Sequence, residues 1–233
     1  MLSKTGGICL RNFFRLLRRL LVIVLICFGV WLYRTDTNVR YATNDSLNVL
    51  FTRINQLIAT GSLQLPKEIN QTEDHEPTAT SKDKPATWSK ATASVFLNLD
   101  DNQQLKAASL NAINVWNQTG AFRFVLTNQK KTADIVISTV DDPNTNAAGQ
   151  TSTTYNPVTG HLLHATVHLN RYYLQNPFYG YNHERIVNTA EHELGHAMGL
   201  SHTNGVSVMY PKGSIYTIQP NDITTLKNLY HEK

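Results

Sequence analysis

The chain has 233 residues, of which 41% are hydrophobic and 16% are charged. This composition excludes a coiled coil, a collagen-like repeat and a highly charged disordered chain, and the length suits one domain of about 150 residues with additions. Residues 1–34 hold six of the 21 basic residues and none of the 17 acidic ones, so the remainder, with 15 basic and 17 acidic residues, is slightly acidic. The folded part therefore gives no electrostatic reason to bind nucleic acid.

An uncharged run of 14 residues, Leu20–Tyr33, follows the basic pair Arg18 and Arg19. A spanning helix needs about 20 residues, but two preceding leucines extend the run if the arginine side chains reach the lipid headgroups. Residues 34–40 contain no small residues suited to signal cleavage. We therefore expect residues 1–34 to form a cytoplasmic tail and a single uncleaved transmembrane helix, with the rest of the chain extracellular. A cleaved signal peptide, and hence a secreted protein, is the alternative.

Both cysteines, Cys9 and Cys27, lie in this N-terminal segment. The rest of the chain therefore has no disulfide and no thiol for catalysis or metal binding. An exported domain without disulfides is compatible with a bacterial cell surface.

Residues 35–85 are predicted to form a helix and a polar stalk. Asn44–Thr60 has apolar residues at helical spacing, with candidate capping residues at its start and Gly61 as a stop. We expect this helix to pack on the domain or on a second copy of itself, and the oligomeric state stays open. Residues 61–87 are polar, contain prolines and show no periodicity, which is typical of a linker.

From Trp88 onward the pattern is that of an α+β domain, and residues 86–233 are taken as its extent. The predicted strands are Ala93–Leu99, Phe122–Leu126, Ile135–Thr139, Gln150–Tyr155 and Leu162–Leu169. The predicted helices run from a cap at Asp100 or Asp101 to Thr119, from Asn182 to Met198, and from Pro220 towards the C-terminus. The threonine-rich segment Gln150–Tyr155 is expected to be an exposed edge strand.

The second of these helices contains the motif HELGHAMGLSH. His192 and His196 lie four residues apart, one turn apart on one helix face, so both imidazoles can bind one metal ion, and neutral imidazole suits Zn²⁺. Gly199 allows the chain to leave the helix, after which His202 can reach back as the third ligand. Three protein ligands leave a fourth position for water, which is typical of catalytic zinc.

Glu193 follows the first histidine and is expected to project beside the metal, where it can accept a proton from water as a general base. This residue favours an enzyme over a non-catalytic zinc-binding cell-surface module, which would not need it. A zinc hydrolase of a non-peptide substrate stays open, because the motif does not specify the substrate.

The motif and its surroundings resemble the matrixins, a branch of the metzincin metallopeptidases. HELGHAMGLSH matches the zinc motif of that family, and Val208–Pro211 resembles its Met-turn, in which a methionine lies beneath the zinc ligands. Residues 133–137 look like the third strand of the family, and residues 220–230 look like its C-terminal helix. The resemblance covers about residues 86–233.

The resemblance implies a matrixin-like zinc metalloendopeptidase domain with a mixed twisted sheet, an active-site helix and a C-terminal helix. It implies Glu193 as the catalytic residue, His192, His196 and His202 as the ligands of one catalytic Zn²⁺, and protein or peptide substrates. A substrate is expected to bind extended along Gln150–Tyr155.

The chain differs from many matrixins in its cysteines and in the region before the active-site helix. No cysteine follows Cys27, which excludes latency through a cysteine on the zinc. A second zinc at His161, His164 and His168 is a weaker prediction, because strand histidines are more often solvated or hydrogen-bonded.

Two further features are the acidic pair after the third predicted strand and the tyrosine after the methionine. A calcium site at Asp141 and Asp142 is predicted only weakly, since an acidic loop is usually just solvated. Tyr210, next to the methionine, is expected to pack rather than to bind metal.

Overall fold

The computed structural model describes residues 6–60, 85–212 and 215–231. The chain divides into two compact units, Met1–Asn55 and Gln56–Lys233. Gly61 and most of the predicted linker lie outside the described residues, so the predicted domain boundaries stay predictions.

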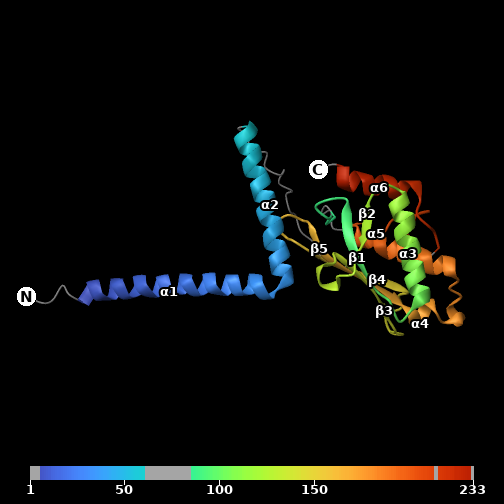
Figure 1. The fold of residues 1–233 in the computed structure, drawn as a ribbon, viewed down its shortest axis with the longest axis horizontal. Helices are drawn as coiled ribbons and strands as arrows, with labels where there is room; N and C mark the ends of the chain where they lie inside the picture. Colours follow the sequence, from blue (N-terminus) through green and yellow to red (C-terminus); the bar gives the residue numbers. More distant parts are fainter. Residues whose placement is uncertain (1–5, 61–84, 213–214, 232–233) are drawn as a thin grey trace, which may run out of the picture. The chain divides into compact units, whose positions relative to one another are not determined.

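The first unit contains helix α1, Gly6–Thr35, and most of helix α2, Thr37–Thr60 (Figure 1). Helix α2 begins earlier than the predicted start at Asn44. The carboxylate of Asp36 explains this, because it accepts hydrogen bonds from the backbone N–H groups of Asn38 at 2.8 Å and Val39 at 3.2 Å. An aspartate in this position satisfies N–H groups that have no partner within the helix.

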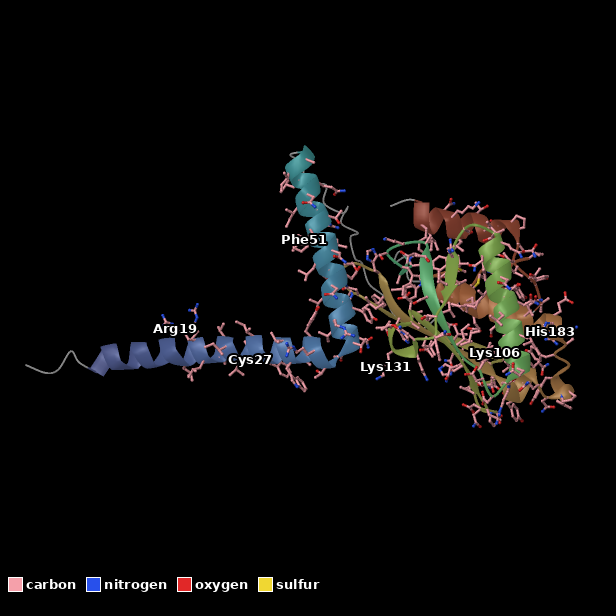
Figure 2. All side chains as sticks on the ribbon, viewed as in Figure 1. Arg19, Cys27, Phe51, Lys106, Lys131 and His183 are labelled. Atoms are coloured by element: carbon pink, nitrogen blue, oxygen red, sulfur yellow. The ribbon has the colours of Figure 1, made fainter. Side chains whose placement is uncertain are left out.

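The large apolar side chains of α1 between Leu20 and Trp31 are exposed, and Figure 2 shows Cys27 on the same helix. No single helix in the described part of the chain is long and apolar enough to cross a membrane. The segments Leu17–Thr35 and Thr37–Ala59 reach that length and hydropathy only as a pair, and they are bent by 106°. The predicted transmembrane helix therefore stays a prediction.

The second unit is built on a five-stranded mixed sheet, as predicted for the α+β domain. Its strands are β1 (Thr92–Asn98), β2 (Arg123–Leu126), β3 (Ile135–Val140), β4 (Gly149–Tyr155) and β5 (Leu162–Asn170). The order is β2-β1-β3-β5-β4, in which only β4 runs antiparallel to its neighbour. Strand β4 thus lies at the edge of the sheet, as expected for this threonine-rich segment.

The helices of this unit are α3 (Gln103–Gln118), α4 (Arg171–Leu174), α5 (His183–Ala197) and α6 (Pro220–His231), with short turns η1 (Lys130–Thr132) and η2 (Pro177–Tyr179). Helix α3 is capped by Asn102, whose side-chain oxygen accepts the N–H of Leu105 at 3.1 Å. The predicted cap at Asp100 or Asp101 is therefore wrong. Asp100 instead forms an ion pair with Lys106 at 2.7 Å.

Helices α3 and α5 contact each other, and α5 also contacts β4 and β5 (Figure 1). Alternate strand residues such as Val95, Ile137 and Val167 are buried with apolar residues of both helices in one core. The indole N–H of the buried Trp116 on α3 donates to the backbone oxygen of Glu191 on α5 at 3.0 Å. This packing fixes α5, the helix that carries the histidine motif.

Candidate metal centre

The structure brings the three predicted histidines together at one point. The distance between the Nε2 atoms is 3.2 Å for His192 and His196, 3.1 Å for His196 and His202, and 3.3 Å for His202 and His192. Ligand nitrogens at about 2.0–2.1 Å from a tetrahedral zinc are about 3.3–3.4 Å from one another. The triangle therefore fits one zinc ion with a fourth position left over.

Two backbone carbonyls set the tautomers of the first two histidines. Nδ1 of His192 lies 2.6 Å from the oxygen of Val208, and Nδ1 of His196 lies 2.9 Å from the oxygen of Leu200. A carbonyl can only accept, so each Nδ1 carries the proton and each Nε2 presents a lone pair to the centre of the triad. Such converging lone pairs repel one another unless a cation lies between them.

Burial favours the neutral form of these imidazoles. Burial lowers the pKa of His196 to about 4, and it lowers the pKa of His192 as well. Neutral imidazole is the form that binds a metal ion. The first two ligands therefore need little deprotonation at neutral pH.

The third ligand depends on the turn after α5. Helix α5 ends at Ala197, and Gly199 adopts a left-handed conformation with φ of +98°. A Cβ atom at Gly199 would lie 2.4 Å from the backbone oxygen of Ala86, so a side chain is excluded on steric grounds as well. The predicted role of this glycine is confirmed, and it turns the chain so that His202 reaches the other two rings.

Met209 is 2% exposed and packs against α5, the helix that carries His192 and His196. Its sulfur packs against α5 so closely that a Cβ atom on Gly195 would lie 2.3 Å from it. Glycine within the motif thus makes room for the methionine. The ring of the neighbouring Tyr210 packs edge-on against the ring of Tyr216, with the ring centroids 5.8 Å apart.

The turn that carries Met209 is held by the buried carboxylate of Asp222 on α6. This carboxylate accepts the hydroxyl of Ser207 and, at 2.9 Å in each case, the backbone N–H groups of Val208 and Gln219. Since the oxygen of Val208 accepts the Nδ1 proton of His192, Asp222 positions one histidine of the triad through one intervening residue.

Glu193 lies on α5 beside the triad and is 5% exposed. The hydroxyl of Thr151 on β4 donates to its carboxylate at 2.6 Å, and burial raises the pKa of Glu193 to about 7. Gly149 lies equally close, because a Cβ atom there would be 2.6 Å from Oε1 of Glu193. The start of β4 therefore holds this carboxylate in place.

A cleft of about 560 Å³ opens onto the triad and Glu193. The cleft is lined by residues 146–151, which form the start of β4 and the segment just before β4. Its other lining residues include Tyr181, Thr189, Pro211 and Lys212. The arrangement combines three metal ligands, a carboxylate with a pKa suited to proton transfer near neutrality, and an exposed strand edge within one cleft.

The other predicted metal sites receive no such support. The only group of histidine, cysteine or acidic side chains in the described residues that is placed to hold a metal ion is the triad. His161, His164 and His168 therefore do not form a second site among those residues, although Nδ1 of His168 is buried without a hydrogen-bond partner.

The acidic loop is likewise explained without calcium. Asp141 pairs with Arg171, whose Nη2 atom lies 2.8 Å from its carboxylate. Asp142 accepts the backbone N–H of Asn144 at 2.8 Å within its own turn. Each carboxylate therefore has a partner within the protein.

Several contacts at the site could not be predicted from the sequence. Thr151 and Gly149 contact Glu193 from a strand far away along the chain, and Asp222 acts on His192 through the turn at Val208. No local pattern in the sequence indicates these pairings, because each depends on how distant elements pack.

Comparison with known proteins agrees with the geometry. The model of the peptidase M10 family, described as matrixin, matches residues 82–231. A search of curated proteins returns no match. The family match covers more than half of the chain and includes the whole histidine triad, so the chain belongs to the matrixin family of zinc metallopeptidases.

Proposed function

We propose that this chain is a zinc-dependent metalloendopeptidase in which Glu193 is the general base. The observation that carries the proposal is the convergence of three Nε2 atoms within 3.3 Å of one another, next to a carboxylate that lines the same cleft. The family match supports the same chemistry.

The metal, when bound by His192, His196 and His202, supplies Lewis-acid chemistry that polarises a carbonyl oxygen and acidifies water. Glu193 accepts the proton that the attacking water loses and then donates it to the leaving amine. Its raised pKa, about 7, suits both steps near neutral pH. The hydroxyl of Thr151 holds the carboxylate while the proton moves.

We expect the substrate to bind in an extended form along β4. This strand is at the edge of the sheet, most of its residues are exposed, and its first residues line the cleft. Backbone pairing with such an edge holds a peptide without demanding particular side chains. Of two adjacent residues in an edge strand, only one directs its N–H group outward.

This alternation gives a paired test with Thr153→Pro and Thr154→Pro. The variant that replaces the residue with the outward N–H group loses a donor to the substrate and should raise KM. The variant at the adjacent position loses a donor to β5 and should disturb the pairing of β4 with β5. Zinc content, measured in both, reports whether the fold is retained. Unchanged KM in both variants would show that the substrate binds elsewhere.

The proposal includes a single membrane anchor at residues 1–34, with a cytoplasmic N-terminus and an extracellular catalytic domain. The basic residues before Leu20–Tyr33 and the exposed apolar side chains of α1 support it. N-terminal sequencing and carbonate extraction of the protein from cells test it. Recovery of a chain that begins after residue 33 in the medium would instead indicate a cleaved signal.

The activity is tested with the full-length, zinc-loaded chain and a peptide library. Cleavage within peptides should disappear with a chelator and return with zinc. Glu193→Gln should keep the zinc and lose about 10²–10⁴-fold in kcat, because only the proton-accepting role is removed. The exposed Glu184 on the same helix provides the matched control Glu184→Gln. Wild-type cleavage rates in Glu193→Gln would refute the general base.

His196→Ala provides the complementary test of the metal ligands. Metal analysis should find about one zinc per wild-type chain and none in the variant. Full retention of zinc in His196→Ala would overturn the assignment.

A further inference from the structure

The charges around the cleft are unevenly distributed. Among the residues that line it, only Glu193 and Lys212 carry a formal charge when the histidines are neutral. Glu193 is 5% exposed and is engaged by Thr151, whereas Lys212 is exposed. The charge that the cleft presents to a bound molecule, apart from a metal, is therefore positive.

The backbone that carries Lys212 is well anchored. The buried Met209 lies three residues before it, and the backbone N–H of Tyr210 donates to the oxygen of Ser207 at 3.1 Å. Pro211 then restricts the backbone immediately before the lysine. This anchoring on the N-terminal side of Lys212 holds its backbone at the cleft, and its long, exposed side chain can adjust to a ligand.

Arg185 packs against one residue of the cleft lining. The guanidinium carbon of Arg185 lies 4.2 Å from the ring centroid of Tyr181, which lines the cleft. Arg185 also donates to the oxygen of Gly180 at 3.2 Å, which holds it against the ring. Arg185 thus supports the ring of Tyr181 in the wall of the cleft, and Lys212 is the cation among the described lining residues.

We propose that Lys212 makes the cleft prefer peptide substrates that carry an aspartate or glutamate close to the scissile bond. The proposal rests on the proposed peptidase function. The carboxylate of the substrate pairs with the ammonium group of Lys212, and no exposed acidic side chain among the described lining residues competes for it. An exposed ion pair of this kind is expected to favour a glutamate over a glutamine by about two- to fivefold in kcat/KM.

The test uses the full-length, zinc-loaded chain and peptides that are identical except for glutamate, glutamine or lysine at one position, scanned across the scissile bond. The wild type should prefer glutamate at one or more positions, and the preference should weaken in about 1 M salt, where charges are screened within about 3 Å. Lys212→Glu should reverse the preference towards lysine.

Lys131→Glu is the matched control, because Lys131 is exposed in turn η1 outside the cleft lining and is labelled in Figure 2. It changes the net charge equally and should keep the wild-type preference, and zinc content should be equal in both variants. Cleavage without any preference for glutamate, or a preference that Lys212→Glu leaves unchanged, would overturn the role of Lys212 alone. Absence of all zinc-dependent cleavage would overturn the peptidase function with it.

Discussion

Substitution of Asp222 should weaken both the fold and the metal centre, although its carboxylate is not one of the converging metal ligands. The side chain is 3% exposed and accepts hydrogen bonds from the hydroxyl of Ser207 and from the N–H groups of Val208 and Gln219. The carbonyl of Val208 in turn accepts the Nδ1 proton of His192 at 2.6 Å. One carboxylate therefore fixes the turn that orients a ligand.

The expected magnitude follows from the number of donors left without an acceptor. Asp222→Ala removes the acceptor of two backbone N–H groups and one hydroxyl, and a buried donor without a partner costs about 1–3 kcal/mol. With three such donors, the free energy of unfolding should fall by about 3–9 kcal/mol, a large part of the 5–15 kcal/mol typical of a domain. Asp222→Asn keeps one carbonyl oxygen and should lose only about 1–3 kcal/mol.

The zinc affinity should fall together with the stability. Loss of a group that orients a ligand typically costs about 10–100-fold in metal affinity. Denaturant unfolding and competitive zinc titration measure the two effects, and the exposed neighbour Asn221 provides the control Asn221→Ala. If Asp222→Ala and Asp222→Asn both match that control within about 0.5 kcal/mol and in zinc affinity, the carboxylate does not support the site.

Three more outcomes are expected. Gly149→Ala should displace the carboxylate of Glu193, because Oε1 lies 2.6 Å from the position of the new Cβ atom. The kcat should fall at least about tenfold with zinc retained, and a wild-type kcat would contradict this contact. Gly195→Ala should lower the free energy of unfolding by up to about 2 kcal/mol, because the clash with Met209 outweighs the helix preference of alanine. In a double-mutant cycle, Met209→Ala should relieve this loss. Burial lowers the pKa of His196 to about 4, so the metal-free fold should lose stability as the pH falls from about 6.5 towards 4. The loss should exceed that of His196→Gln by about 3 kcal/mol. Denaturant unfolding at each pH measures it, and equal losses in the two proteins would rule out this contribution.

The local features of this protein could be predicted from the sequence. The spacing of His192 and His196 places both on one helix face, and Gly199 predicts the turn after it, because helical geometry and glycine conformation are local properties. Apolar periodicity likewise predicts the five strands and the helices α3, α5 and α6 to within a few residues, whereas the short helix α4 was not predicted. The sequence did not predict the start of α2 or the cap of α3 at Asn102, because several polar residues in a row can each cap a helix.

The contacts that make the site work were decided by tertiary structure. The sheet order β2-β1-β3-β5-β4 brings Gly149 and Thr151 against Glu193 although they are distant in the chain. Packing of α6 places Asp222 under the turn that orients His192. The role of such a side chain depends on a partner that is distant in the sequence, so the residues next to it along the chain do not indicate that role. The motif therefore predicts from sequence alone the three histidines that converge in the structure, whereas only the fold determines what holds them and the neighbouring carboxylate in place.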